Sequence, residues 1–511
     1  MVKIYAVLLL LLLSSGVELK GQTFSLTSRL GHLSAQYNSM LLESGRIFCT
    51  GVIQDTTSPY LTFNVFASYD TTGQLNYYKV FKGDSSIQEV GTFENALIKT
   101  NSGGFAVCGY TISSGKINCL FIKYDNTGQV SVWRQYKKNL SAFFGRNIIK
   151  AVNGGYYLTG TAQKLNGNID IFLMYIDESG NEVWYKTYGE PAWQEYANSL
   201  ILTKDSNILI MGSKSDDNTS PPYSYEFRKV LLLDQNGNII LDSVGNDENV
   251  SSTFDIASTE DGGYIFCGSY VSDRTAGHER EVGYIEKVDS NLHSVWQKKL
   301  GSAAPLSMTF INSINECANG DILASGYILN ESIPVSQQHQ NGWLIKLNSA
   351  GALIWSREYR GVTRIGQDIE ENKLFDFGVL DDGGIIACGK AQDDNDTFPQ
   401  KTWLLRIDKD GCLNDSFCGY TEIEENVGES LTSFEVYPNP FISKLFLKVV
   451  KSSMVEVNIM DVMGQNVYFN RLNLTEEKDI ASFDLEYLPS GLYFLQLATS
   501  EGRTTKRLIK P

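Results

Sequence analysis

Short apolar stretches alternate with polar turns along most of the chain, and one arrangement of them recurs seven times. The clearest copy runs from Gly154 to Gly189 and reads GGYYLTG, a variable gap, and FLMYIDESGNEVWYKTYG. Each copy contains a Gly turn, a short strand closed by a second Gly, an alternating strand, a D-x-x-G turn and a last strand with a large residue. Recurrence at such a period indicates a structural repeat.

Two kinds of glycine mark the period. The closing glycines are 51 to 63 residues apart: Gly51, Gly109, Gly160, Gly212, Gly268, Gly326 and Gly389. The D-x-x-G turns begin at Asp70, Asp125, Asp177, Asp234 and Asp408. Two copies depart from the pattern, because Asn348 stands before Gly351 and Leu292 replaces the Gly after Asp289. Asp bonds its own backbone and Gly accepts positive φ, so both suit tight turns.

Four short strands in each of seven copies predict an all-β chain with a seven-bladed β-propeller over residues 22–419. Each fourth strand holds a large residue: Tyr77, Trp133, Trp184, Leu241, Trp296 and Trp355. We interpret this column as packing between blades, and contact of the tryptophans with a ligand is the alternative.

The seventh copy stops after its third strand, TWLLRID. The stretch FSLTSRLGH at Phe24–His32 is similar to VWQKKLGS at the end of the fifth copy. We hypothesise that this N-terminal stretch is the missing fourth strand, which would close the ring and remove two open edges.

The two ends of the chain differ from the repeats. Residues 1–21 have the Lys3, the apolar run and the small residues of a secretory signal peptide, with cleavage after Gly16 or Gly21. An acidic linker spans residues 420–431 and a second domain spans residues 432–511. No other apolar run is long enough to span a bilayer as a helix, so we expect a soluble mature protein.

The composition limits the partners. The chain has 59 acidic and 43 basic residues, a net charge of −16. An acidic ring argues against nucleic-acid binding, which needs basic patches. A solvated acidic surface that keeps a secreted protein soluble is the simpler explanation.

Eight cysteines in a chain of this length do not form a disulfide scaffold. Cys108, Cys267 and Cys388 share one repeat position, just before the closing Gly, which we expect to be buried. Cys412 and Cys418 are disulfide candidates, and Cys108 with Cys119 is a second candidate pair.

The last eighty residues carry ordered motifs and about seven short alternating strands, which predict a small Ig-like β-sandwich. The motif positions are Tyr437, Pro438, Asn439, Pro440, Asp461, Gly464, Leu488, Gly491, Tyr493, Lys506 and Lys510. In this order they resemble the type A C-terminal sorting domain of the type IX secretion system.

The resemblance implies an export route and a location outside the cell. Such domains direct folded cargo across the outer membrane, and the cargo is released or anchored to lipopolysaccharide. The implied partners are the general inner-membrane export channel and the outer-membrane translocon with its peptidase. We therefore expect a protein that is secreted or held on the outer surface of a Gram-negative bacterium.

The predicted second turns and crossovers are long and irregular, and they share one face of a propeller. Function concentrates in variable loops on a rigid scaffold, so we expect the binding site on that face. The candidate residues are Trp193, Tyr196, Tyr223, Tyr225, Tyr270, Arg274, His278, Arg280, Tyr327 and His339. The alternative is that they are ordinary loop residues.

Recognisable catalytic motifs are missing from the sequence. The four histidines, His32, His278, His293 and His339, are scattered, so we expect no metal centre and no cofactor. Acidic runs at 216–218 and 393–396 are candidates for calcium, with solvated loops as the alternative. Asp408-x-Asp410-Gly411 lacks the acidic twelfth residue of a calcium loop, so we interpret it as the ordinary turn of the repeat.

The leading hypothesis is a non-catalytic propeller that binds a glycan or protein partner through its long-loop face. The rival is an extracellular hydrolase or lyase, such as a sialidase-like glycosidase. Carboxylate pairs for glycoside cleavage meet in space rather than in sequence, so the sequence leaves both open. Convergent carboxylates or arginines at the mouth of the channel would favour an enzyme, and a flat aromatic surface would favour binding.

Overall fold

The structure is a computed structural model. It describes residues 23–57, 60–84, 87–215, 226–245, 247, 249–250, 252–275, 278–301, 307–330, 339–362, 370–393, 400–413, 424–425, 434–449, 453–461, 466–474, 480–499 and 502–511. The predicted signal peptide lies outside these residues. The chain divides into two compact units, residues 1–423 and residues 424–511.

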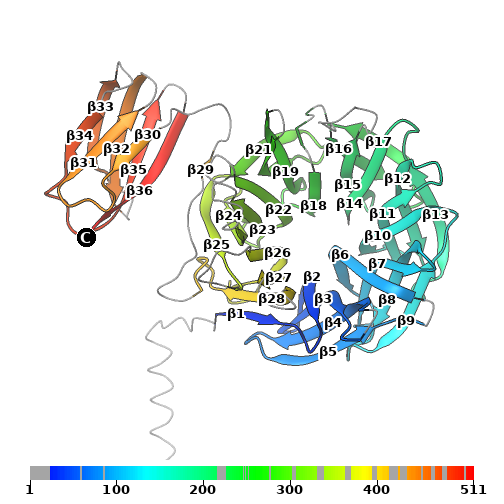
Figure 1. Ribbon diagram of the computed structural model, residues 1–511. Helices are drawn as coiled ribbons and strands as arrows, with labels where there is room; N and C mark the ends of the chain where they lie inside the picture. The colour runs from blue at the N-terminus through cyan, green and yellow to red at the C-terminus, as the bar shows by residue number, and fades with distance from the viewer. Residues whose placement is uncertain are drawn as a thin grey trace, which may run out of the picture. The chain divides into compact units, whose positions relative to one another are not determined.

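The strands of the first unit pair antiparallel in groups of four, arranged around a ring (Figure 1). The first groups along the chain are β2 (Ser34–Glu43), β3 (Arg46–Gln54), β4 (Thr62–Asp70), β5 (Leu75–Phe81); β6 (Ile87–Lys99), β7 (Phe105–Ser113), β8 (Lys116–Tyr124), β9 (Val130–Tyr136); and β10 (Ala142–Lys150), β11 (Tyr156–Gln163), β12 (Ile169–Ile176), β13 (Glu182–Tyr188). Next come β14 (Gln194–Leu202), β15 (Ile208–Ser215), β16 (Glu226–Leu233), β17 (Ile239–Val244); and β18 (Ser252–Ser258), β19 (Tyr264–Thr275), β20 (His278–Val288), β21 (Ser294–Gly301). The last strands are β22 (Ser307–Glu316), β23 (Ile322–Asn330), β24 (His339–Leu347), β25 (Leu353–Tyr359); and β26 (Glu370–Val379), β27 (Ile385–Asp393), β28 (Gln400–Ile407), joined by β1 (Phe24–Ser28).

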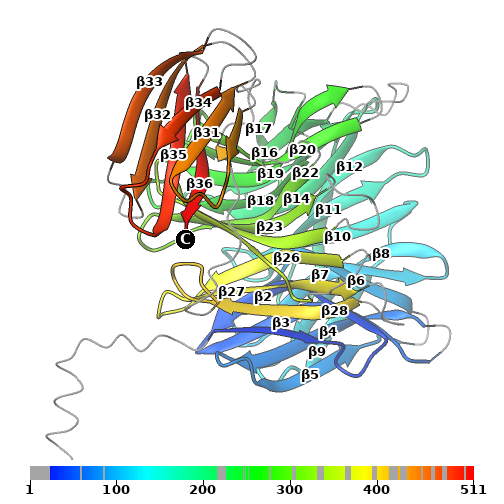
Figure 2. The same cartoon turned by 60° about the vertical axis from the view of Figure 1, so that its left-hand side comes forward.

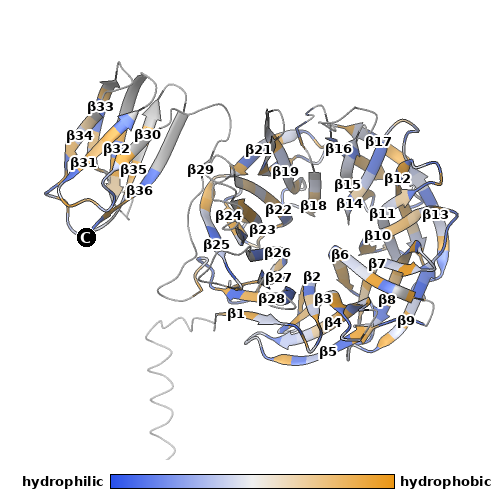
Figure 3. Ribbon diagram, in the orientation of Figure 1, coloured by the Kyte–Doolittle hydropathy of each residue, from blue (hydrophilic) through white to orange (hydrophobic). Residues whose placement is uncertain are grey.

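The first strand of each group lies nearest the centre of the ring, and Figure 1 shows β2, β6, β10, β14, β18, β22 and β26 there. The second and third strands are almost wholly buried, as β15 is along its whole length. The outer strands are far more exposed, as β17 is. Figure 3 shows the same gradient, with hydrophobic residues along the middle strands and hydrophilic ones at the turns and outer strands. The apolar core therefore lies within and between the groups.

The D-x-x-G turns share one hydrogen-bond pattern. In the turn that follows β4, Asp70 Oδ1 accepts the backbone N–H of Thr72 at 2.9 Å and of Gln74 at 3.0 Å. The two degraded copies keep the pattern. Asn348 uses its side-chain oxygen in the same way, and Leu292 adopts φ +66° in place of the missing Gly.

Several large residues of the column pack against the turn glycine of the next group, as predicted, whereas Trp133 packs on Phe81 of the preceding group. A Cβ added at Gly237 would lie 3.0 Å from Trp184, and one at Gly351 would lie 2.9 Å from Trp296. Leu241 is an exception, because its side chain is exposed.

The cysteine predictions are confirmed in part. Cys108, Cys267 and Cys388 are buried free thiols, as expected for their column. Cys412 is disulfide-bonded, while its expected partner Cys418 lies outside the described residues. The pairing of Cys108 with Cys119 is wrong, because both thiols are free.

The N-terminal strand closes the ring, which confirms the hypothesis drawn from Phe24–His32. β1 pairs antiparallel with β28, from Phe24 opposite Arg406 to Ser28 opposite Thr402. Trp403 Nε1 donates to Ser25 Oγ at 3.0 Å, and Thr402 Oγ1 donates to the Ser28 carbonyl at 2.9 Å.

Each inner strand has a β-bulge at the same place, just where it pairs with the closing glycine. The bulged residues are Asn38, Arg146, Asn198, Phe254, Asn312 and Phe375, and in β6 the register shift spans Phe93–Ala96. The bulge brings backbone against backbone, because a Cβ added at Gly51 would lie 2.0 Å from the Gln36 carbonyl oxygen. The closing glycines therefore mark the bulges of the inner strands.

Side chains beside the bulges join neighbouring inner strands around the channel. The side-chain amides of Asn38, Asn198 and Asn312 donate to backbone carbonyls of the next inner strand, at 2.5, 2.6 and 2.9 Å. Two buried carboxyl groups, Asp255 and Asp376, complement them by accepting backbone N–H groups.

Asp376 on β26 accepts the N–H of Met40 at 2.7 Å, and Asp255 on β18 accepts that of Ile314 at 3.1 Å. Ser313 Oγ lies 3.1 Å from Asp255 and 3.4 Å from Asp376, so it links the two carboxyl groups. Burial raises the pKa of Asp255 to about 6 and that of Asp376 to about 7.

The second unit contains two sheets (Figure 2). One pairs β30 (Phe434–Tyr437), β31 (Lys444–Val449) and β34 (Ile480–Asp484), and the other pairs β33 (Asn466–Leu474), β32 (Ser453–Asp461), β35 (Gly491–Thr499) and β36 (Gly502–Lys510). β29 (Glu424–Glu425) precedes them. Leu447 and Phe483 from the first sheet pack in one core with Val457, Leu495 and Leu508 from the second.

Deletion of Phe24–Ser28 from the full chain should lower the Tm of the first unit by about 5 °C or more, because β28 becomes an unpaired edge. Differential scanning calorimetry measures the change. Val152→Ser, at an exposed turn position, serves as the control that leaves the Tm in place. An unchanged Tm after the deletion would show that the closing strand contributes nothing.

Asp376→Asn should destabilise the ring by about 2 kcal/mol at pH 4. Both oxygens of the carboxyl group, which is protonated at that pH, can each accept one backbone N–H, whereas the NH2 of the amide cannot accept. The difference in the free energy of unfolding between wild type and Asp376→Asn should shrink as the pH rises. The raised pKa means that the stabilisation by Asp376 is complete below about pH 4 and is lost as the pH passes about 7.

Urea unfolding of both proteins between pH 4 and pH 8 measures this difference. The matched control is Asp125→Asn, because hydrogen bonds from Thr127 lower the pKa of Asp125. Its contribution is present above the unfolded pKa and is lost only below about pH 4, so the destabilisation by Asp125→Asn should stay constant from pH 4 to pH 8. Parallel trends for the two variants would contradict the assignment.

Candidate functional site

The bulge of β6 is the irregular element at the centre of the ring. Its register shift covers the four residues Phe93–Ala96, whereas each of the other inner strands shifts by one residue. Asn95 has φ +54°, which allows the backbone to reverse there. β6 approaches β22 and β26 from across the channel (Figure 1). The charged residues of β26 described below lie in the first half of that strand, toward the end of the ring where the inner strands begin. We call this end the channel mouth.

Glu94 lies on this bulge and is half-buried. Among the described residues, no side chain forms a hydrogen bond or an ion pair with its carboxylate. Burial raises the pKa of Glu94, and a hydrogen bond from its own backbone N–H and the positive charges of Arg146 and Lys373 oppose that shift. With no described side chain bonded to it, the carboxylate can still accept hydrogen bonds from a ligand.

Arg146 is the bulged residue of β10. Its guanidinium carbon lies 4.4 Å from the centre of the Phe93 ring, and its Nη1 donates to Asn198 Oδ1 at 3.3 Å. Its Nε is buried and has no hydrogen-bond partner, and burial lowers the pKa of the guanidinium. Phe93 packs with Tyr110 and Phe144, so this side of the mouth is an aromatic wall that carries a cation.

Lys373 on β26 provides a second cation. Its Nζ lies 4.6 Å from the centre of the Tyr327 ring, which stacks on Phe310 at 4.8 Å. Glu371 lies 3.8 Å from Lys373 and 2.7 Å from Lys390. Burial opposes the ionisation of Glu371, but the hydrogen bond from Lys390 and the positive charges of Lys390 and Lys373 together outweigh it, so the pKa of Glu371 is lowered. Burial lowers the pKa of Lys373.

Four of the residues singled out from the sequence lie near this end of the ring. Tyr327 contacts Lys373, and Tyr196 on β14 is close enough to influence the charge of Arg146. Lys299 Nζ lies 3.5 Å from the centre of the Tyr270 ring. Trp193 contacts Phe227, and Lys214 Nζ lies 4.6 Å from the centre of its ring.

The other candidates are not brought together in the described part of the chain. Tyr223 and Tyr225 lie outside it. Arg274, His278 and Arg280 belong to an extended hairpin of β19 and β20, paired up to Thr275 opposite His278, and His339 pairs with Asn330. The expected irregular loops are therefore partly β-hairpins, because strand pairing continues beyond the closing glycines.

The candidate calcium sites gain no support. The acidic runs 216–218 and 394–396 lie outside the described residues, and the described residues contain no cluster of three metal-ligating side chains. Asp408 Oδ1 accepts the N–H of Asp410 at 3.0 Å and of Cys412 at 2.7 Å, so this segment is the repeat's ordinary turn, as interpreted from the sequence.

The residues that carry the charge at the mouth, Glu94, Arg146 and Lys373, are absent from the sequence-based candidates. They lie within strands, and the candidates were sought in loops. The closing glycines were a usable signal, because each one stands opposite a bulge that turns a residue out of the ladder.

In the second unit the motif residues surround the last strand. Asn439 Nδ2 donates to the Arg507 carbonyl at 2.7 Å, and Asn439 Oδ1 accepts the N–H of Ile509 at 2.8 Å. Lys510 Nζ donates to the carbonyls of Leu485 and Glu486, both at 2.8 Å. The entry segment, the turn before Leu488 and the basic terminus thus form one hydrogen-bonded edge.

Residues 435–511 match the secretion system C-terminal sorting domain. The chain therefore carries a type IX sorting domain, and the protein is secreted or reaches the outer surface of a Gram-negative bacterium. Gly464, one of the motif positions, lies outside the described residues. Within the described residues, no helix has the length and apolarity needed to cross a membrane.

No curated protein matches the chain. Solved structures resemble it at low identity. An ulvan lyase from a new family of polysaccharide lyases is 10% identical, over 77% of this chain and 96% of that one, with a TM-score of 0.44. An α-L-arabinofuranosidase from Fusarium graminearum is 9% identical, over 76% of this chain and 98% of that one, with a TM-score of 0.38. Drosophila Semaphorin 1a is 8% identical, over 78% of this chain and 89% of that one, with a TM-score of 0.42.

Asn439→Ala should reduce export, because it removes both bonds from the entry segment to β36 and destabilises the sorting domain by about 1–2 kcal/mol. Immunoblots of the periplasm, cell surface and medium measure the distribution in a host with the type IX system. Ile442→Ser, at a neighbouring exposed position, is the control. Equal export of Asn439→Ala and wild type would show that this edge is not needed.

Proposed function

We propose that the first unit is a seven-bladed β-propeller over residues 22–419. The antiparallel groups of four, each with one inner bulge, support it, and so does the closure of the last group by β1. Residues 420–431 would then be the linker, and residues 432–511 an Ig-like sandwich. The pairing of three strands in one sheet and four in the other supports the sandwich.

We propose that the protein binds a glycan at the channel mouth. The observation that carries this proposal is the Glu94 carboxylate, which no described side chain satisfies, within the influence of two cations that each lie over an aromatic ring. A sugar presents hydroxyl groups to carboxylates and guanidinium groups, and its C–H face packs on aromatic rings. Tyr196 and Tyr327 would contribute contacts at the rim.

The sorting domain would bring this site outside the cell. Export would use the general inner-membrane channel and then the type IX translocon, and a cleavable signal peptide over residues 1–21 would begin the route. The protein would be released or anchored to lipopolysaccharide, and either outcome gives the mouth access to extracellular or surface glycans.

An extracellular glycosidase or lyase is the second candidate, and one observation favours it. The pKa of Glu94 is raised while that of Glu371 is lowered, and Lys373 influences both. Two carboxyl groups with pKa values moved in opposite directions suit the roles of acid and base in glycoside cleavage. In that case Glu94 would donate the proton and Glu371 would act as the anion.

Binding of the full mature chain to immobilised neutral and uronic-acid-containing oligosaccharides tests the proposal. Arg146→Ala should weaken binding by about tenfold or more, since it removes a charge-assisted contact. Lys150→Ala is the matched control, because Lys150 is the exposed residue at the other end of β10. No binding to any member of the panel, or equal binding by Arg146→Ala, would overturn the proposal.

Release of reducing ends or unsaturated products from the same panel separates the two candidates. If the protein is an enzyme, Glu94→Gln should lower kcat by about a hundredfold or more and leave substrate binding nearly intact. If the protein only binds, no product forms, and Glu94→Gln weakens binding by a few-fold.

A further inference from the structure

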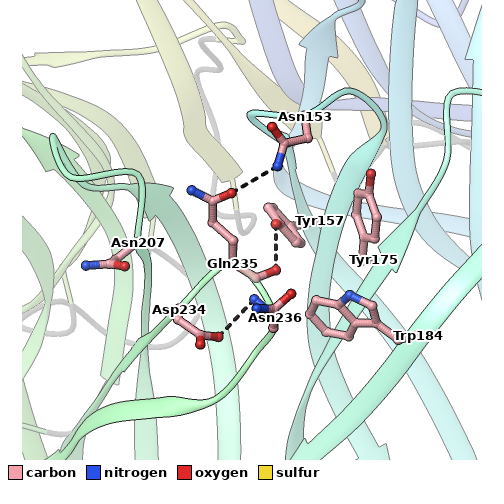
Figure 4. A pocket seen from close by; sticks show the side chains of 8 residues that line it. All are labelled: Asn153, Tyr157, Tyr175, Trp184, Asn207, Asp234, Gln235 and Asn236. Atoms are coloured by element: carbon pink, nitrogen blue, oxygen red, sulfur yellow. Dashed lines mark hydrogen bonds between the residues drawn. The ribbon is translucent and has the colours of Figure 1, made fainter.

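A second cavity lies at the other end of the strands, between the group β10–β13 and the group β14–β17. Its volume is about 440 Å³, within the usual range for ligand pockets. Its lining residues, shown in Figure 4, are Asn153, Tyr157, Tyr175, Trp184, Asn207, Asp234, Gln235 and Asn236. All of them lie in or beside the tight turns, whereas the channel mouth lies where the inner strands begin.

Three aromatic rings form one wall of this cavity. The centre of the Tyr157 ring lies 5.2 Å from that of Tyr175 and 6.0 Å from that of Trp184, and Tyr175 and Trp184 are also 6.0 Å apart. Tyr157 donates its hydroxyl to the Gln235 carbonyl at 2.8 Å, and Tyr175 donates to the Gly154 carbonyl at 2.9 Å. The rings are thus fixed in place before any ligand arrives.

Side-chain amides form the facing wall. Asn153 Nδ2 donates to Gln235 Oε1 at 3.2 Å, which orients the Gln235 side chain (Figure 4). Within the described residues the Gln235 NH2 group and the side-chain amides of Asn207 and Asn236 have no hydrogen-bond partner. Each offers donors that water or a ligand can satisfy.

The preceding interface shows why a cavity forms here. Between the group β6–β9 and the group β10–β13, Lys123 pairs with Glu178 at 3.3 Å, and Asn101 donates to the same carboxylate at 3.2 Å. Tyr175 occupies the repeat position of Lys123, two residues before the turn Asp, and Gln235 occupies that of Glu178, one residue after it. The ion pair that fills one interface is replaced by neutral groups in the next.

We propose that this cavity binds a neutral sugar residue, with the C–H face of the ring against Trp184 and Tyr175 and the hydroxyl groups on Asn207, Gln235 and Asn236. Amides both donate and accept, so they match hydroxyl groups without requiring a charge on the ligand. This site is separate from the one proposed at the channel mouth, and each stands without the other.

Tryptophan fluorescence and calorimetry on the full mature chain test the proposal, with glucose, galactose, mannose, arabinose and their short oligomers as probes. Wild type should bind at least one probe with a Kd in the millimolar range or tighter. The double variant Tyr175→Lys/Gln235→Glu rebuilds the ion pair of the neighbouring interface, so it should fold and lose binding by about tenfold or more. Asn207→Ala should weaken binding several-fold.

Two outcomes would overturn the proposal. One is that no probe binds at concentrations up to about 50 mM, well above a millimolar Kd. The other is that the double variant and Asn207→Ala, with wild-type Tm values, bind as wild type does. Arg146→Ala separates the two sites, because it should weaken binding at the mouth alone. Probe binding that survives in Arg146→Ala and is lost when Tyr175→Lys/Gln235→Glu is added belongs to this cavity. Probe binding lost in Arg146→Ala would assign it to the mouth and overturn this second site.

Discussion

The carboxyl groups of Asp255 and Asp376 satisfy backbone groups that the sheets leave unpaired. Each inner strand is the edge of its own group, and its backbone faces the channel with little pairing beyond that group. β10 and β26 also pair in parallel with the third strand of the preceding group, but over one and two residues. Asp376 takes the N–H of Met40 and Asp255 that of Ile314, in each case on the next inner strand around the ring. The asparagines of the bulges do the same for carbonyls. Side-chain-to-backbone bonds thus join groups that have few backbone bonds of their own.

The same bulges make the channel mouth. A bulged residue leaves the ladder, so its side chain is free to point elsewhere. Where that residue is Asn38 or Asn312, the side chain is buried and ties neighbouring strands together. Where it is Arg146, and where β6 inserts Phe93–Ala96, charge and aromatic surface reach the channel instead. The β-bulges of the inner strands therefore both join neighbouring groups and place charged and aromatic side chains at the channel mouth.

The sequence predicted what repeats and missed what is irregular. The Asp turns, the closing glycines, the packing aromatics and the missing strand at Phe24 could be found because each is a local pattern, or its absence, at a known period. The bulges were missed because the closing glycines were interpreted only as the ends of strands, whereas they mark the close approach of the bulged inner strand. Glu94, Arg146 and Lys373 come together only in space, from β6, β10 and β26. The hairpin of β19 and β20 was missed because its polar residues are typical of a loop.

Trp184 shows how a packing position can also form a site. Its ring edge lies against Gly237, as Trp296 lies against Gly351, so the column has the same structural role in both places. The surroundings of Trp184 differ from those at the preceding interface. Tyr175 and Gln235 occupy the repeat positions at which Lys123 and Glu178 form an ion pair there. An empty apolar void of this size would destabilise the ring, whereas a polar cavity can be occupied by water or a ligand. Strands paired along their whole length separate this cavity from the channel mouth, so we expect substitutions at one end to leave the register at the other intact.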